Sequence, residues 1–404
     1  MIYAMAKQNI TNQIPINIDL NASLKGFNKA TIITAAHHVI MKHYASPLLL
    51  GPKPGDTLLS LVAHMFTEDE ADLVQHLKPL RPATAEAVSK RSGRSVDDVS
   101  RVLNHLAWTK FVLFSTGDPR KYMILPIVPG TFELALMTTD ISSRNQWHKE
   151  FALMFERLWD EGHIQDYAFS TRPAIRYLPV AKVKTLHAAW PSDKLEEILS
   201  PYHIFAVGNC QCRLAMRLSD KGCDRPLENC LGFGPLVQPV IDRGLMRQID
   251  IQEAIAIKRN AEEHGCVTWM ANEMGDWRGN FSCSCCGCCC HGLRIITQFN
   301  APGLFSQPHF MPKKHPDKCT LCHKCVKSCP TQAITIDNQQ LVFQEQRCIG
   351  CGLCVVSCPF DALELQIVDN AMPPEDSWIS LLLKMMPGYL YNSAKVWAKR
   401  MWTN

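Results

Sequence analysis

The first half of this 404-residue sequence contains no cysteine, although the whole chain has 19. All of them lie between Cys210 and Cys358, whereas the cysteines of a disulfide-bonded scaffold are spread through a small secreted domain. We interpret this clustering as a set of metal ligands in a reducing compartment, and we therefore expect a cytoplasmic protein.

Other signals are missing as well. No run of about 18 apolar residues is present, so the sequence predicts no membrane-spanning helix. The first ten residues, MIYAMAKQNI, lack a basic stretch followed by an apolar core, and we expect no secretory signal. There is no Gly-x-Gly-x-x-Gly after a strand, no phosphate-binding loop, and no visible Ser-His-Asp arrangement or carboxylate pair. These absences predict a chain without a nucleotide site and without its own electron source, such as a flavin.

The strongest motif that is present occurs twice. Cys-x2-Cys-x2-Cys-x3-Cys-Pro covers residues 319–330 and, 29 positions later, residues 348–359. The repeat extends beyond cysteine, because Ala333 and the residues after it recur from Ala362. Three thiolates at this spacing can bind three irons of one [4Fe–4S] cube, and the fourth, before proline, turns away and binds the other cube.

We therefore expect two clusters with crossed ligands. One set is Cys319, Cys322, Cys325 and Cys358, and the other is Cys348, Cys351, Cys354 and Cys329. Residues 314–368 closely resemble the two-cluster bacterial ferredoxins. Zinc sites or disulfides are the alternative, but the doubled spacing ending in Cys-Pro is not a zinc pattern. Because an exposed cube is sensitive to oxygen, we expect an anaerobic or low-oxygen setting.

A second cysteine-rich region covers residues 201–300. An apolar run at residues 203–207 is expected to form a strand that ends at the first cysteines. Crowded thiols oxidise readily unless a metal holds them as thiolates. One structural zinc ion takes four ligands and leaves many idle, so at least one further iron–sulfur cluster is favoured, with zinc as the alternative. The candidate ligands are Cys210, Cys212, Cys223, Cys230, Cys283, Cys285, Cys286, Cys288, Cys289 and Cys290.

Adjacent cysteines limit the choice of cluster. Cys285-Cys286 and Cys289-Cys290 cannot easily point both sulfurs into one small cube, which predicts either two clusters that share the segment or a non-cubane cluster. Residues 190–368 resemble poorly characterised cysteine-rich [4Fe–4S] dicluster proteins of anaerobic bacteria, which implies electron transfer but no defined reaction. The Cys-Cys-Gly at 285–287 is also similar to a motif of heterodisulfide reductases, although their tandem arrangement is absent.

Three nearby residues carry separate expectations. Arg213 either raises the potential of a cluster or binds an anionic partner, or else it forms a surface salt bridge. His291 is expected beside the ligands or exposed to solvent rather than bound to metal. Cys266, alone after a predicted helix end, is expected to be a buried small residue.

Residues 56–127 resemble a winged helix-turn-helix domain, with four predicted helices followed by a hairpin that turns at residues 117–119. The resemblance implies DNA binding through the helix after Ser95. Asp97 and Asp98, however, begin that helix and repel phosphates, so we expect a packing or docking module. The predicted helices begin near Thr57, at a capping box formed by Thr67, at Thr84 and at Ser95.

Together these patterns predict an α+β, multidomain chain. Further helices are expected over residues 145–159 and after the caps Asp193 and Asp250. The predicted parts are an N-terminal extension (1–55), a winged-helix-like domain (56–127), a helical connector (128–200), a cysteine-rich α/β domain (201–300), a ferredoxin-like domain (311–370) and a basic amphipathic tail (371–404).

The tail accounts for the excess of positive charge. The formal net charge is +4, and residues 377–404 contain four basic residues and no acid. The pattern predicts a break at Pro387-Gly388, followed by an amphipathic helix. Such a helix is typical of a membrane surface or a partner contact, and packing against the rest of the chain is the alternative. Its predicted apolar face contains Leu390, Ala394, Trp397 and Met401.

We interpret the chain as an iron–sulfur protein that carries electrons between redox partners, such as flavoproteins or oxidoreductase subunits. We expect it in the cytoplasm, with a possible place at the inner face of the membrane, and not on nucleic acid. Two alternatives stay open: a redox-sensing DNA-binding regulator, and an oxidoreductase that acts on a substrate at the central cluster.

Overall fold

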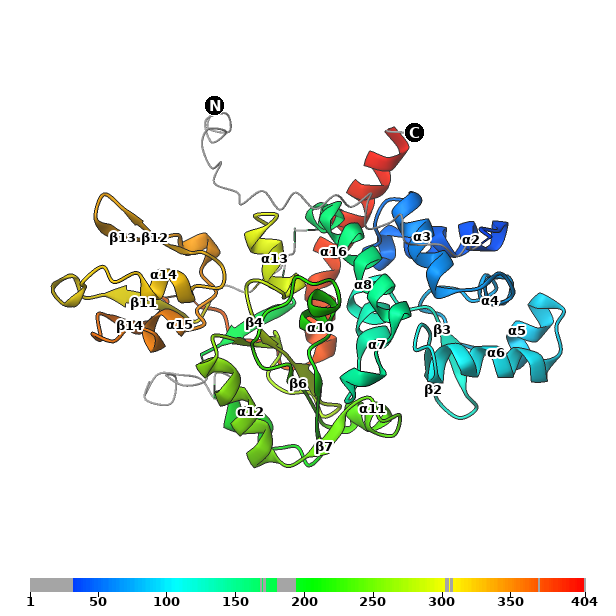
Figure 1. Ribbon diagram of the computed structural model, residues 1–404, viewed down its shortest axis with the longest axis horizontal. Helices are drawn as coiled ribbons and strands as arrows, with labels where there is room; N and C mark the ends of the chain where they lie inside the picture. Colours follow the sequence, from blue (N-terminus) through cyan, green and yellow to red (C-terminus); the bar gives the residue numbers. More distant parts are fainter. Residues whose placement is uncertain are drawn as a thin grey trace. The chain divides into compact units, whose positions relative to one another are not determined.

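Helices and small sheets alternate along the chain in the computed structural model (Figure 1). This mixture confirms the α+β class. Residues 33–404 form one unit. No helix among the described residues is long and apolar enough to cross a membrane. The structure describes residues 32–167, 169, 172–179, 194–301, 305, 308–369 and 371–402.

Three α-helices precede the first strand within the described residues from position 32 on, and each buries one apolar face. Ile40, Leu61 and Leu73, one from each helix, are fully buried. The third helix begins at the predicted capping box, in which the Thr67 hydroxyl accepts the Glu70 N–H and the Glu70 carboxylate accepts the Thr67 N–H. These helices are α2 (Ala35–Tyr44), α3 (Asp56–Met65) and α4 (Glu68–Val74).

A helix pair and a three-stranded sheet follow, with strand order β1-β3-β2. The Ser95 hydroxyl accepts the Asp98 N–H and so caps α6 as expected. Antiparallel pairing of Phe114 with Met123 forms the predicted hairpin. The elements are β1 (Ala83–Thr84), α5 (Ala85–Ser92), α6 (Val96–Trp108), β2 (Phe114–Thr116) and β3 (Lys121–Met123).

Residues 127–167 are mostly helical, and the main element there is the predicted amphipathic helix. Asn145 caps α8 by accepting the Trp147 N–H, and Phe151 and Phe155 on its inner face are buried. This part of the chain contains an irregular turn (Ile127–Thr131), α7 (Phe132–Leu136), a 3-10 turn (Ile141–Ser143), α8 (Gln146–Asp160) and a second 3-10 turn (His163–Tyr167).

Two sheets make up the cysteine-rich region, with strand orders β7-β5-β6-β9 and β10-β8-β4. All their strand pairs are antiparallel. The predicted α/β class, which describes parallel β-α-β units, is therefore wrong for this region. The strands are β4 (Ile175–Leu178), β5 (Phe205–Asn209), β6 (Glu228–Phe233), β7 (Arg247–Ile249), β8 (Val267–Ala271), β9 (Asn280–Ser282) and β10 (Ser284–Cys285).

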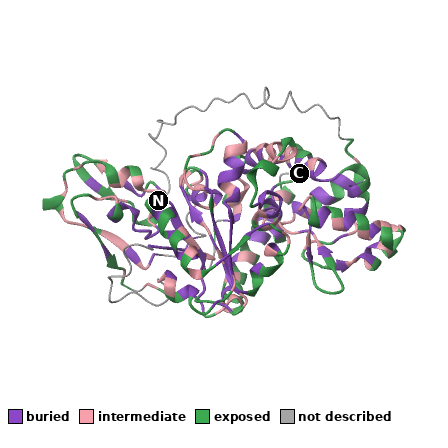
Figure 2. Cartoon of the chain, turned by 60° about the horizontal axis from the view of Figure 1, so that its bottom comes forward, coloured by how far each residue is buried: buried purple, intermediate pink, exposed green. Residues whose placement is uncertain are grey.

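Helices pack around these strands, and both the helices and the strands contain buried residues (Figure 2). Asp250 caps α12 as predicted, because its carboxylate accepts the Glu253 N–H at 2.8 Å. Asp193 lies outside the described residues. The helices are α9 (Leu195–Leu199), α10 (Gln211–Leu218), α11 (Gln238–Ile241), α12 (Ile251–Glu263) and α13 (His291–Thr297).

The C-terminal sequence repeat is also a backbone repeat. Three pairs of residues 29 positions apart have a positive φ: Leu321 and Gly350, His323 and Gly352, and Gln332 and Asp361. The chain therefore turns in the same way twice. The antiparallel pairs are β11 (Phe310–Lys314) with β14 (Leu363–Ile367) and β12 (Ile334–Asp337) with β13 (Gln340–Phe343), and the helices are α14 (Lys324–Ser328) and α15 (Leu353–Val356).

The last helix, α16 (Trp378–Trp402), runs through Pro387 without ending. The predicted break at this point is therefore wrong. Contacts with distant segments hold the helix, since Asn392 Nδ2 donates to the Tyr167 carbonyl at 3.2 Å and Arg400 Nη2 donates to the Gly51 carbonyl at 2.8 Å. Packing of one face thus outweighs the hydrogen bond that proline removes.

Candidate metal centres

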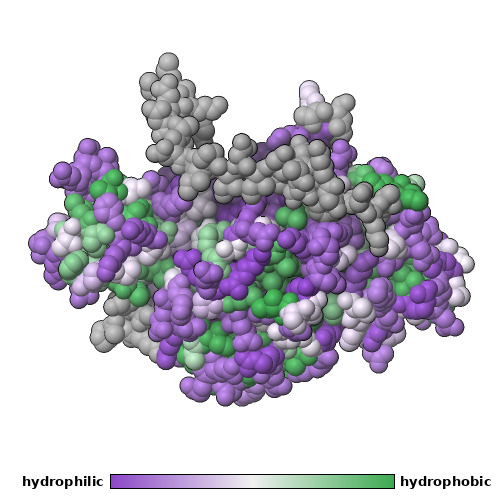
Figure 3. Space-filling view, in the orientation of Figure 1, coloured by the Kyte–Doolittle hydropathy of each residue, from purple (hydrophilic) through white to green (hydrophobic). Residues whose placement is uncertain are grey.

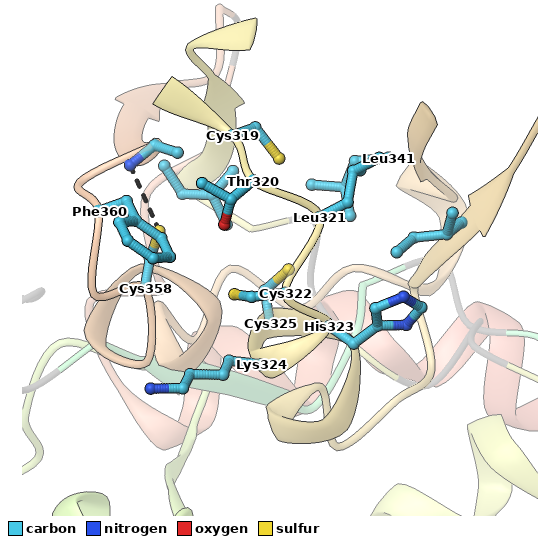
Figure 4. A pocket seen from close by; sticks show the side chains of 13 residues that line it. Cys319, Thr320, Leu321, Cys322, His323, Lys324, Cys325, Leu341, Cys358 and Phe360 are labelled. Atoms are coloured by element: carbon cyan, nitrogen blue, oxygen red, sulfur yellow. Dashed lines mark hydrogen bonds between the residues drawn. The ribbon is translucent and has the colours of Figure 1, made fainter. Parts of the chain in front are cut away.

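Four C-terminal cysteines surround one hollow, which we call the outer site (Figure 4). Cys325 lies in α14, whereas Cys358 follows α15 in the other half of the repeat. The structure therefore brings together the first predicted ligand set, including the crossed member. The outer site contains Cys319, Cys322, Cys325 and Cys358.

The other four C-terminal cysteines line a second hollow, which we call the inner site. In both sites the crossed cysteine accepts a backbone N–H bond: Ala333 donates to Cys329 Sγ at 3.2 Å, and Ala362 donates to Cys358 Sγ at 3.3 Å. Hydrogen bonds to thiolate sulfur help to set the potential of a bound cluster. The inner site contains Cys329, Cys348, Cys351 and Cys354.

The two sites differ in exposure. Cys322 is exposed, whereas Cys351, its equivalent in the repeat, is only 9% exposed. Burial raises the pKa of Cys351 and of Cys354 well above the usual value, so these thiols ionise only with difficulty unless a metal holds them. The outer site thus faces solvent, and the inner site faces the protein.

The ten central candidates fall into two groups. In the first, which we call the four-thiol site, the sulfur atoms all lie within 4.8 Å of one another. Cys289 Sγ is 3.6 Å from both Cys223 Sγ and Cys288 Sγ, and Cys223 Sγ is 3.8 Å from Cys286 Sγ. Cys288 is exposed, while Cys286 and Cys289 are buried.

The other six candidates form a second group, which we call the six-thiol site. Their thiols shift one another's pKa in a chain, in which Cys212 interacts with Cys210 and Cys290, Cys285 with Cys290 and Cys283, and Cys283 with Cys230. Interactions with Cys212 and Cys285 lower the pKa of Cys290 below its usual value. A lowered pKa favours the thiolate, which is the form that binds metal.

Strand ends bring the six thiols together. Cys210 follows β5, Cys230 lies on β6 opposite Gly208, and Cys285 ends β10. Both adjacent pairs noted in the sequence are divided between the sites, because Cys285 and Cys290 belong to the six-thiol site and their neighbours to the four-thiol site. This division agrees with the interpretation in which two centres share one segment.

Arg213 lies between the two groups. It is 0% exposed, so the surface salt-bridge interpretation is wrong. Its Nη2 donates to Cys286 Sγ and Cys266 Sγ, both at 3.4 Å, and to the Ser284 carbonyl at 3.1 Å. Burial alone lowers the pKa of Arg213, but the thiolates of Cys210 and Cys286 raise it far above the usual value. The guanidinium is therefore a fixed positive charge, and Cys266 is buried as expected.

Two further cations near the thiols were not predicted. Lys258 on α12 is fully buried, and its Nζ donates to the Ser282 carbonyl at 2.7 Å and the Cys283 carbonyl at 2.8 Å. Burial lowers the pKa of Lys258 to about 8, against the opposing effect of the thiolates. Arg225 Nη1 lies 3.5 Å from Cys288 Sγ. In the sequence, the position of Lys258 on the buried face of α12 could have indicated this residue. No feature of the sequence indicated Arg225.

His291 is buried and paired, not exposed, and it belongs to neither thiol group. Its Nε2 is 2.5 Å from Glu156 Oε1 on α8, and Arg294 Nη1 donates to Glu156 Oε2 at 2.7 Å. Burial lowers the pKa of His291, and the hydrogen bond and charge of Glu156 oppose this shift. Burial alone raises the pKa of Glu156, but the hydrogen bond from His291 and the charge of Arg294 lower it to about 2.

Tyr177 lies between the six-thiol site and the inner site, and no pattern in the sequence indicated it. Its hydroxyl is buried without a hydrogen-bond partner among the described residues. Burial raises the pKa of Tyr177, and the nearby thiolates of Cys285 and Cys351 raise it further. At the same junction, a Cβ on Gly287 would lie 2.3 Å from the Pro330 carbonyl oxygen, so the cysteine loop packs directly on the inner-site segment.

A family described as a 4Fe-4S dicluster domain matches residues 318–367. Neither a curated protein nor a solved structure matches the chain. The match indicates [4Fe–4S] clusters in the C-terminal segment, and the cysteine group at residues 223–289 suggests a further centre in the cysteine-rich region. Together they support an iron–sulfur electron-transfer role.

Proposed function

We propose that this chain relays electrons between partner proteins through three centres in series. The outer and inner sites each hold a [4Fe–4S] cluster, bound by the two crossed sets of four cysteines, and the six-thiol site holds a further iron–sulfur cluster. Electrons enter or leave at the outer site because Cys322 faces solvent. They pass through the buried inner site to the six-thiol site.

The proposed order of the three centres rests on one observation. The thiolates of Cys351, from the inner site, and Cys285, from the six-thiol site, both act on the buried Tyr177. Tyr177, Cys285, Cys290 and Cys351 also belong to one apolar core. A single buried side chain thus borders both sites, which favours electron transfer from one to the other without solvent between them.

The repeat supplies a matched pair of variants to test the order. Cys322→Ala removes a ligand from the outer site, and Cys351→Ala makes the same change 29 residues later in the inner site. Adjacent paramagnetic centres speed each other's spin relaxation. In EPR spectra of the anaerobically reduced full chain, we expect Cys351→Ala to slow the relaxation of the six-thiol centre and Cys322→Ala to leave it unchanged. Equal effects of the two variants would contradict the series.

We further propose that the segment with sheet order β1-β3-β2 is a winged-helix module used for packing and docking. Two observations support this over DNA binding. Arg94 and Arg101 both donate at 2.6 Å to Asp98, near the start of α6, so their charge is already paired. Arg243, from the cysteine-rich region, donates to the Ser115 carbonyl and lies over the Trp108 ring at 4.5 Å.

The regulator alternative makes a different prediction. A DNA-binding regulator should hold duplex DNA tightly, with an affinity that falls steeply with salt. We expect no sequence-selective, sub-micromolar binding in fluorescence anisotropy at physiological salt. Such binding by the clustered full-length protein would establish the regulator instead. The oxidoreductase alternative requires a substrate that reacts at a central centre, and none is indicated by the residues around either thiol site.

The exposed face of α16 is proposed as the contact with a redox partner. Leu383 and Trp397 on this face are 67% and 59% exposed. On the largely hydrophilic face shown in Figure 3, apolar side chains form separate small areas. Lys384 pairs with Glu375 and Lys399 with Asp166. These pairs reduce the charge offered to anionic lipid, which favours a protein partner over a membrane surface. We propose a cytoplasmic location.

A further inference from the structure

We propose that the four-thiol site binds a single tetrahedral metal ion and is a centre separate from the six-thiol site. The ion belongs to the class that favours four thiolates, namely zinc or iron in the divalent state. This inference does not depend on the electron relay proposed above. The ligands are Cys223, Cys286, Cys288 and Cys289.

The distances between the sulfur atoms carry the inference. Four thiolates about 2.3 Å from one ion, at the corners of a tetrahedron, lie about 3.8 Å from one another. Three of the sulfur–sulfur distances in the site are 3.6, 3.6 and 3.8 Å, and all four sulfur atoms lie within 4.8 Å of one another. In a cube each thiolate binds a different iron, so the separation between irons is added to every sulfur–sulfur distance. The four-thiol site is sized for one ion.

The same chain provides the comparison. Among the residues that the structure describes, this is the one set of three or more candidate ligands gathered closely enough to hold a single ion. The outer-site and inner-site cysteines instead line hollows. Figure 4 shows the open space between the cysteines of the outer site. The sulfur atoms are closely spaced in the four-thiol site and surround a hollow in the outer and inner sites, which indicates two different kinds of metal centre.

The order of the ligands along the chain supports the same conclusion. Residues 286–289 supply three of the four ligands, and the adjacent Cys288 and Cys289 point their sulfur atoms to the same place, 3.6 Å apart. A loop this tight can surround one ion, whereas it would have to open to reach three separate irons.

The surrounding charges fit a thiolate-bound ion. One divalent ion with four thiolates has a net charge of −2, which is costly to bury unless positive groups are near. Arg213 contacts Cys286 Sγ at 3.4 Å, and Arg225 contacts Cys288 Sγ at 3.5 Å. The two guanidinium groups therefore place two positive charges beside the site, which balance its net charge of −2.

Cys288→Ser tests the proposal, because Cys288 is exposed and its hydroxyl replacement leaves the core intact. The full chain is purified anaerobically, and iron, zinc and acid-labile sulfide are measured per chain. We expect the variant to lose one metal ion and no sulfide, without the EPR signal of a [3Fe–4S] cluster in the oxidised sample. The element that is lost identifies zinc or iron.

Cys322→Ser in the outer site is the matched control, since it changes an exposed ligand of a cube. We expect this control to lose sulfide together with iron, or to show the [3Fe–4S] signal. The same behaviour in Cys288→Ser would show that the four-thiol site holds a cluster. An unchanged metal content in Cys288→Ser would show that the site binds no metal. Either result overturns the proposal.

Discussion

Glu156 connects helix α8 to the segment that follows the last central cysteine, and Glu156→Gln should weaken this connection. The carboxylate is about 3% exposed and accepts from His291 at 2.5 Å and from Arg294 at 2.7 Å. Removing one partner of a buried ion pair costs about 3–5 kcal/mol. Arg294 keeps its contact with Asp160 at 3.0 Å, so its charge is not stranded and the lower end, about 3 kcal/mol, is expected.

Anaerobic thermal unfolding, followed by circular dichroism at one fixed scan rate, measures this effect. In a chain of this size about 3 kcal/mol corresponds to a midpoint lower by roughly 3–5 °C. Asp160→Asn is the control, because it removes the exposed partner of the same arginine and should cost under about 1 kcal/mol. A Glu156→Gln midpoint no lower than that of the control would refute the reasoning.

The stabilisation by Glu156 should also depend on pH in a defined window. The folded pKa of Glu156 is about 2, below the value of 4.5 expected in the unfolded chain. Its contribution is therefore complete above about pH 4.5 and is lost as the pH falls toward 2. The midpoints of wild type and Glu156→Gln should differ most near neutrality and converge in acid.

Two further predictions concern Arg213 and Trp397. Arg213→Gln should lower the potential of the six-thiol centre, because the buried guanidinium interacts with the Cys210 thiolate and its positive charge favours the reduced, more negative cluster. An EPR redox titration that shows no shift, or an upward one, would contradict this. Trp397→Ser should leave the binding of anionic lipid vesicles unchanged in co-sedimentation, and loss of strong vesicle binding on this substitution would show that α16 is a membrane contact.

Local signals predicted the secondary structure well. The caps at Thr67, Ser95 and Asp250 are each made by the side chain that the sequence indicated. These predictions succeed because a cap depends on residues within one turn. The break at Pro387 failed because contacts between α16 and distant segments decide it, and these are not visible in a local pattern.

The cysteines were identifiable from spacing, but their surroundings were not. The crossed grouping at the outer and inner sites follows from the repeat, which is a local property of the sequence. The partition of the central thiols depends on how strands from two segments meet. Arg213, Lys258 and Tyr177 take their significance from burial beside thiols, and burial is set by the whole fold.

Gly287 sets how closely two cysteine-bearing segments approach each other. Any side chain at this position would meet the Pro330 carbonyl, because even a Cβ would lie 2.3 Å from its oxygen, and the two segments would have to separate. Electron tunnelling slows steeply as the gap between donor and acceptor widens. In the relay proposed above, the absence of a methyl group at this one position would therefore hold the C-terminal clusters and the central centre at their closest approach and favour fast exchange between them.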